Sequence, residues 1–108
     1  MQGEFHVIRE YLMVKLPEEI DHHKTTQLSQ EADSYIMSGR IKDIVFDFYD
    51  TRFMDSSGIG LIMGRYKKIS CFGGRLYAIH ADQQILKILS IAGLTHYIEL
   101  IEEAQVKG

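Results

Sequence analysis

Two short stretches near the start of the chain alternate hydrophobic and polar residues with a period of two, which predicts strands. They cover residues 4–9 and 11–16. The link between them, Arg9-Glu10, is short enough to predict a hairpin. Pro17 ends the second strand because it has no backbone N–H to donate to a sheet.

After Pro17 the pattern alternates between a helical period and a strand period. The predicted elements are a helix capped by Asp21 that ends near Ser38 before Gly39, a strand over 43–48, and a loop over 49–55 that leads into a helix ending near Cys71. They continue with a strand over 75–79 after Gly73-Gly74, a helix capped by Asp82 that stops at Gly93, and a short strand over 97–100. Apolar residues fill four of the six positions of 43–48, including the run Ile44-Val45-Phe46, and we expect this strand to be covered on both faces. We expect residues 102–108 to fray or to form one helical turn.

Strands that alternate with helices predict a mostly parallel sheet with right-handed crossovers, in which the first strand is an antiparallel edge. We therefore expect one α/β domain over residues 1–108, with four or five strands and three or four helices. Sites in such sheets lie beyond the carboxyl ends of the strands. The loop after the strand at 11–16 and the loop after the strand at 43–48 would form one surface if these two strands are neighbours. The polar residues of the first loop are Glu19, Asp21, His22 and His23, and those of the second are Asp55, Ser56 and Ser57.

Charge and composition narrow the classes of function. The 108 residues carry a formal net charge of -3, with 45% hydrophobic and 25% charged residues, as in an ordinary soluble domain. A mildly acidic chain gives no electrostatic reason to expect nucleic acid or an anionic membrane as a partner. Cys71 is the only cysteine, and the sequence has neither a signal peptide nor an apolar run long enough to span a membrane. We expect a cytoplasmic protein.

The stretch Phe-Met-Asp-Ser-Ser-Gly at residues 53–58 lies where a strand pattern gives way to a helix pattern. Backbone N–H groups in a first helical turn have no partner within the helix, and the positive end of the helix dipole lies there. Such a position accepts a side-chain oxygen as a cap, and it also accepts a phosphate. Asp55 and the two serines suit either use, and Gly58 suits a crowded turn.

Two other kinds of site fit the residues poorly. Neighbours such as His22-His23 point about 100° apart on a helix, whereas helical metal ligands are usually four residues apart. A serine hydrolase would need the elbow Gly-x-Ser-x-Gly, but Asp55 and Gly58 flank the serines. We therefore expect no metal and no cofactor.

Three glycines follow the serines, but their spacing matches no glycine-rich phosphate loop. Gly60 and Gly64 lie four residues apart within the predicted helix, where each lowers helix stability relative to Ala. Their strip without side chains faces away from the apolar side of the helix. Either the backbone of another protein or a loop of the same domain could pack closely against this strip.

Several segments together carry a resemblance to a known family: Asp21-His22-His23, the run from Ile44 to Gly60 with the 53–58 motif, Gly64-Arg65-Tyr66-Lys67, Gly73-Gly74 and Ile91-Ala92-Gly93-Leu94. They resemble the STAS domain, and within that family the anti-anti-sigma factors of sporulation operons. The likeness covers nearly the whole chain, and the Asp-His-His segment together with the motif makes it specific. One departure is Pro17-Glu18, where relatives often carry Gly-Glu, and we expect the missing glycine to make the loop beside the site stiffer.

The resemblance implies a STAS fold and a phosphorylation-controlled binding module, not an enzyme. In that family an anti-sigma factor with serine kinase activity phosphorylates the serine that matches Ser56. The unphosphorylated protein binds the anti-sigma factor and frees the sigma factor, and a serine phosphatase resets the switch. The residues expected to contact the partner are Asp21, His22, His23, Asp55, Ser57, Gly58, Gly60, Leu61 and Gly64. Two alternatives stay open, a STAS subunit of a stress-signalling scaffold and a small Ser/His hydrolase.

Overall fold

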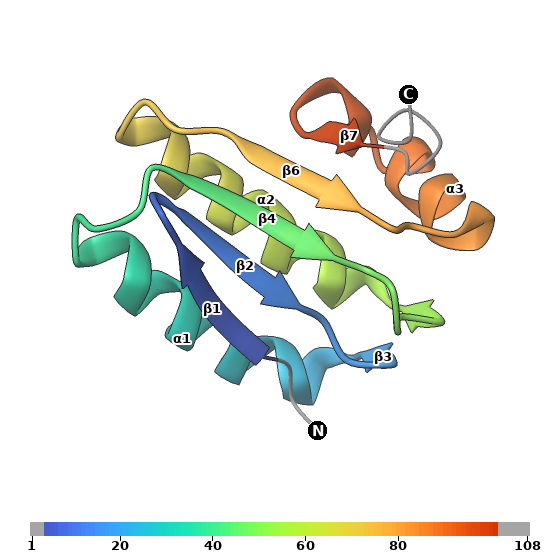
Figure 1. Cartoon of the computed structure of the whole chain (residues 1–108). Coiled ribbons are helices and arrows are strands. Elements are labelled where there is room, and N and C mark those ends of the chain that lie inside the picture. The colour runs from blue at the N-terminus through green and yellow to red at the C-terminus, as the bar shows by residue number, and fades with distance from the viewer. Residues whose placement is uncertain (1–3, 102–108) are drawn as a thin grey trace.

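In the computed structural model, which describes residues 4–101, a five-stranded sheet has the strand order β1-β2-β4-β6-β7 (Figure 1). Its strands are β1 (Glu4–Ile8), β2 (Tyr11–Lys15), β4 (Asp43–Asp47), β6 (Leu76–Ile79) and β7 (Glu99–Ile101). β1 pairs antiparallel with β2, and every other neighbouring pair in this sheet is parallel. The predicted parallel sheet with an antiparallel N-terminal edge is confirmed.

Helices connect the parallel strands, as the alternating pattern predicted. They are α1 (His22–Met37), α2 (Ser56–Cys71) and α3 (Gln83–Ile91), and a 3-10 helix, η1 (Leu94–His96), follows α3. Asp21 and Asp82 cap α1 and α3 with their side chains, as expected. Gly39 and Gly93, the predicted stops, follow those helices with φ angles of 76° and 78°, which glycine adopts at little cost.

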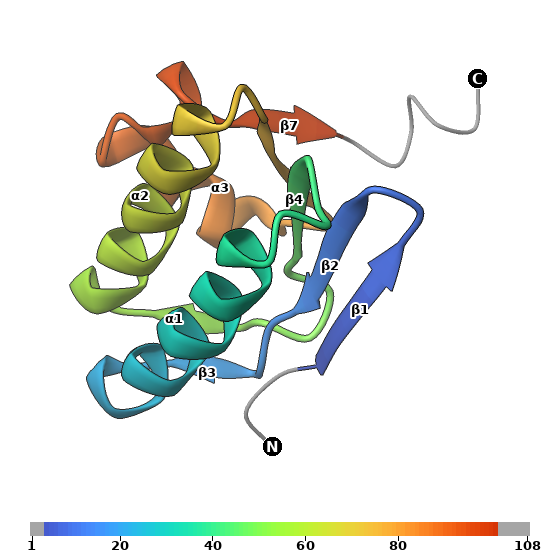
Figure 2. The same cartoon turned by 90° about the vertical axis from the view of Figure 1, so that its left-hand side faces the viewer.

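The helices cover only one face of the sheet. α1 and α2 lie side by side on it, and no helix of residues 4–101 lies over the opposite face (Figure 2). Strand β4 alternates accordingly, since Ile44 and Phe46 are buried while Val45 is half-buried on the open side. The expectation that 43–48 is covered on both faces is therefore wrong for the described chain. The strand order proceeds in one direction from β2 to β7, so right-handed crossovers place their helices on the same side.

The core fills the space between this covered face and the helices. Its largest fully buried side chains are Phe46, Phe48, Leu12, Leu16, Ile20, Ile36, Ile44, Ile62, Ile69, Leu76, Ile85 and Leu89. Burying each such side chain contributes about 1.5–3 kcal/mol. The core thus fixes α1 and α2 against the sheet and sets where their first turns lie.

Two short strands were not predicted. β3 (Glu19–Ile20) and β5 (Phe53–Met54) pair in parallel as a separate two-stranded sheet, in segments that the sequence pattern indicated as loops. The last strand also differs, because residues 94–96 form η1 and β7 therefore begins at Glu99 instead of residue 97. The prediction for 102–108 falls outside the described residues.

Candidate functional site

The β3–β5 pair joins the two loops that were expected to form one surface. Glu19 pairs with Phe53 and Ile20 with Met54, and the Asp55 N–H donates to the Ile20 carbonyl oxygen at 3.2 Å. Each strand runs directly into a helix, β3 into α1 and β5 into α2. The two helix N-termini therefore lie side by side, and the predicted common surface is confirmed through a sheet that the sequence did not reveal.

Asp21 is the N-cap of α1. Its Oδ1 accepts a hydrogen bond from the Lys24 backbone N–H at 3.0 Å, and its carbonyl oxygen accepts from the Thr25 N–H at 3.0 Å. His22 and His23 follow in the first turn, and both side chains are exposed. The carboxylate of Asp21 is half-buried, so it caps the helix while part of it still meets solvent.

Asp55 is the N-cap of α2, and it binds Ser57 twice. Its Oδ1 accepts from the Ser57 backbone N–H at 2.8 Å and also from the Ser57 hydroxyl. The hydrogen bond from the Ser57 side chain is the largest cause that lowers the pKa of Asp55. Backbone N–H groups of Ser57 and Gly58 and the nearby His22 lower this pKa further, while partial burial opposes them. Asp55 is therefore held as a carboxylate beside the two serines.

The two serines of the motif have different environments. The hydroxyl of Ser57 is engaged by Asp55, and Ser57 is half-buried. Ser56, the first residue of α2, is exposed, and no hydrogen bond within residues 4–101 uses its hydroxyl. The cap of α2 is thus Asp55, which leaves the Ser56 hydroxyl accessible at the positive end of a helix.

Two of the predicted contact residues lie beneath this surface. Leu61 is only 3% exposed and belongs to the hydrophobic core. Gly58 is buried, and a Cβ on it would lie 2.2 Å from Met54 Cγ and 3.2 Å from Ile20 Cγ2. Gly58 lets the first turn of α2 approach the β3–β5 pair, so its role is to position the motif. We therefore leave Leu61 and Gly58 out of the contact surface.

Gly60 and Gly64 lie on the open side of α2. A Cβ at either position would meet no atom within 4 Å. Residues four apart lie on one side of a helix, so both glycines continue the side on which Ser56 lies. The alternative that a loop of the same domain packs closely on this strip does not hold for residues 4–101.

An ion pair that the sequence analysis did not predict holds α1 and α2 together. Arg65, 7% exposed, places its Nε 2.9 Å from Asp33 Oδ1, although the two atoms are not aligned as a hydrogen bond. Lys68 Nζ donates to Asp33 Oδ2 at 2.7 Å. Burial lowers the pKa of Arg65, and the charge of Asp33 opposes that change. Spacing within one helix cannot reveal such a pair, because its partners come from different helices.

Other kinds of site find no support among the described residues. No group of three or more His, Cys, Asp or Glu side chains within residues 4–101 is arranged to hold a metal ion. Neither serine of the motif hydrogen-bonds a histidine in that part of the chain. No helix there is long and apolar enough to cross a membrane.

Known proteins resemble this chain over most of its length. The family model of the STAS domain matches residues 4–105. The chain is 34% identical over 94 residues to the anti-sigma F factor antagonist of Paenibacillus polymyxa, which covers 87% of this chain and 80% of that protein.

Two solved structures of SpoIIAA are similar to the whole fold. The anti-sigma factor antagonist SpoIIAA in its unphosphorylated form superposes with a TM-score of 0.84 at 28% identity, covering 96% of this chain and 91% of that one. The Bacillus cell fate determinant SpoIIAA in the phosphorylated form superposes with a TM-score of 0.77 at 28% identity, covering 96% and 95%. The fold described here is thus similar to both forms.

Proposed function

The chain belongs to the STAS domain family, and on that premise we propose that it is an anti-sigma factor antagonist. Its unphosphorylated form binds an anti-sigma factor and thereby releases the sigma factor. Its relatives are regulatory binding proteins, and the same role in the cytoplasm is proposed for this chain.

We further propose that Ser56 is the phosphorylation site and that the anti-sigma factor is the serine kinase. The observation that carries this proposal is the exposed Ser56 hydroxyl at the N-terminus of α2, next to a Ser57 hydroxyl that Asp55 already binds. A kinase needs an accessible, unengaged hydroxyl, and Ser56 meets that requirement better than Ser57. A separate serine phosphatase would remove the phosphate and reset the switch.

The contact surface follows from what lies around Ser56. We assign to it the exposed or half-buried residues of the two helix N-termini and the glycine strip: Asp21, His22, His23, Asp55, Ser56, Ser57, Gly60 and Gly64. A partner that packs against Gly60 and Gly64 can bring its backbone close to α2, because no side chain intervenes. Such a close fit leaves no room for a phosphate at the end of the strip.

A phosphate on Ser56 would act in the interface and leave the fold in place. It adds about -1.5 to -2 charges, and backbone N–H groups at a helix start accommodate such charge. Asp55 is a like charge beside it and offsets part of that gain. In the complex, the phosphate must lose water, and it repels acidic groups that face it, so binding weakens.

The experiment compares Ser56→Ala with Ser57→Ala. Each variant and the wild type are incubated with the anti-sigma factor of the same organism, Mg²⁺ and ATP, and intact mass is measured. Wild type and Ser57→Ala should gain one phosphate, whereas Ser56→Ala should gain none and still bind the anti-sigma factor. Phosphate on Ser56→Ala would contradict the site, and wild-type protein that binds no anti-sigma factor would contradict the function.

A further inference from the structure

We propose that Phe53 is the apolar anchor of the docking surface and inserts into an apolar recess of the anti-sigma factor that has a basic border. The proposal rests on the proposed function and adds a residue to which the motif itself gives no role. Phe53 is 49% exposed, and several other large hydrophobic residues of the described chain are exposed as well, but Phe53 lies in the motif, on the strand that directly precedes the Asp55 cap of α2.

Strand geometry places Phe53 on the same face as the caps of both helices. Its neighbour Met54 is 3% exposed and points into the core, so Phe53 points outward. Residues two apart on a strand share a face, which puts Phe53 beside Asp55 and, across the pair, Glu19 beside Asp21. Glu19 is the direct partner of Phe53 in the register. The outer face of β3–β5 thus presents the Phe53 ring beside Glu19, with the caps Asp21 and Asp55 at the ends of the two strands.

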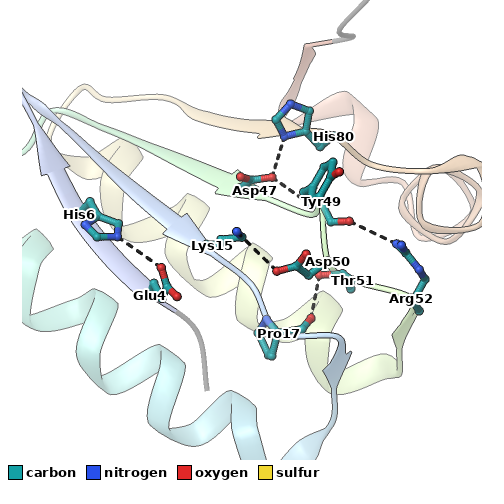
Figure 3. A network of polar contacts seen from close by, with 10 residues as sticks. All are labelled: Glu4, His6, Lys15, Pro17, Asp47, Tyr49, Asp50, Thr51, Arg52 and His80. Carbon is teal, nitrogen blue, oxygen red and sulfur yellow. Dashed lines mark hydrogen bonds and ion pairs between the residues drawn. The ribbon is translucent and has the colours of Figure 1, made fainter. Parts of the chain in front are cut away.

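The backbone under Phe53 is held in place by bonds to the segment before β3. The buried Thr51 donates its hydroxyl to the Pro17 carbonyl oxygen at 2.9 Å (Figure 3). The N–H groups of Arg52 and Phe53 both donate to the Glu18 carbonyl oxygen, at 2.8 and 3.2 Å. Because its backbone is already held in place, this segment loses little backbone freedom when a partner covers it, which favours affinity.

The surroundings of Phe53 indicate the chemistry of the partner. Aromatic residues near the centre of an interface commonly carry a large share of the binding energy when a recess covers them. Glu19 is the register partner of Phe53, and Asp21 and Asp55 follow directly after the two strands as helix caps, so three carboxylates belong to this part of the surface. Two cations are also near, Lys24, which donates to the Glu19 carbonyl oxygen, and Arg52, which donates to that of Tyr49. A neutral carbonyl oxygen does not cancel their charge, but the three carboxylates outnumber these two cations. Lysine or arginine at the border of the partner's recess would therefore complement this face.

Phe72 offers a matched control. It is 58% exposed, so it resembles Phe53 in type and exposure, but it lies at the C-terminal end of α2. The helix between the two ends has 16 residues, which corresponds to about 24 Å. If removing any exposed aromatic ring weakened binding, the loss of affinity would appear in both variants. If Phe53 docks the partner, the loss should appear only in the Phe53 variant.

The test measures binding of unphosphorylated Phe53→Ala, Phe53→Leu and Phe72→Ala to the anti-sigma factor by titration calorimetry. We expect Phe53→Ala to weaken binding at least about 30-fold, as for a hot spot, and Phe53→Leu to weaken it less. Phe72→Ala should bind within about twofold of the wild type. If circular dichroism shows that Phe53→Ala does not fold, Phe53→Thr, which favours a strand, takes its place.

Equal binding of Phe53→Ala and wild type would overturn the anchor while the proposed function stands. Equal losses in Phe53→Ala and Phe72→Ala would also overturn it, because the effect would then not be local to the docking face. A wild-type domain that binds no anti-sigma factor overturns the proposed function and the anchor together.

Discussion

Gly58 and Gly60 stand two residues apart on α2 and face opposite environments. A Cβ on Gly58 would collide with Met54, so the packing of the domain itself explains that glycine. A Cβ on Gly60 would meet nothing within 4 Å, yet glycine within a helix is about 0.8–1.0 kcal/mol less favourable than alanine. One side of α2 is therefore shaped by the fold, and the residues on the other side are better explained by a partner outside it.

The largest expected effect is on the open side and follows phosphorylation of Ser56. Affinity for the anti-sigma factor should fall by about 10³-fold, which corresponds to about 4 kcal/mol, because a charged phosphate enters a close interface. The stability of the free domain should change by about 1 kcal/mol or less, because the helix N-terminus accommodates the charge. Calorimetry gives the affinity, and backbone amide NMR shifts report on the fold.

In that NMR comparison, shifts should change only around Ser56 and Asp21. Changes spread through β4 and β6 would indicate a conformational switch, and an account based on charge and contact alone would be wrong.

The second-largest effect is expected on the packed side of α2, where it is a loss of stability. Gly58→Ala should lower the free energy of unfolding by about 1–3 kcal/mol, because the new methyl group must displace Met54. Urea denaturation followed by circular dichroism measures the loss. A variant as stable as the wild type would show that Met54 moves aside freely and that Gly58 is not required by packing.

Asp21→Asn tests whether the open surface extends to α1. Asn caps a helix about as well as Asp, so thermal stability should stay nearly unchanged. If docking uses the charge, affinity for the anti-sigma factor should fall about tenfold, or about 1.4 kcal/mol. Identical affinities for the variant and the wild type would limit Asp21 to its role as a cap.

Gly60→Ala should have the opposite effect on stability to Gly58→Ala. The free energy of unfolding should rise by up to about 1 kcal/mol, because alanine favours the helix and the position is open. Affinity for the anti-sigma factor should nevertheless fall, since the methyl group separates the two surfaces, and Gly64→Ala should behave alike. A gain in stability without any loss of affinity would remove the glycine strip from the docking surface.

The smallest expected effect is on the pH dependence of stability and comes from Asp55, the N-cap of α2. The pKa of Asp55 is lowered below its ordinary value of 3.8, so its carboxylate stabilises the fold above that pH. This contribution should disappear as the pH falls through the lowered pKa. Asp55→Asn keeps a capping group that does not titrate, so urea midpoints of wild type and variant should differ by a constant amount from pH 7 to about pH 4 and change relative to each other only at lower pH. A constant difference down to pH 2 would contradict this role of the carboxylate.

Much of the fold follows from local pattern. Helices α1 and α3 begin after Asp21 and Asp82 and end before Gly39 and Gly93, because caps and stops act through hydrogen bonds within a few residues. The motif likewise placed Ser56 at a helix start from its neighbours alone.

The sequence by itself therefore determined the order of the elements, the parallel sheet, the helix starts and the motif that carries the proposed site. Asp55 binds Ser57 and leaves the Ser56 hydroxyl unengaged among the described residues through contacts that are themselves local, although the sequence alone did not show which residue would be the cap. Tertiary structure decided that Leu61 is buried while Gly60 is open. It also decided the β3–β5 pair, whose strands are too short to show a period and are held by contacts such as the one between Thr51 and Pro17, 34 residues apart. Local pattern encodes what a residue does with its near neighbours, whereas the docking surface depends on which distant segments meet.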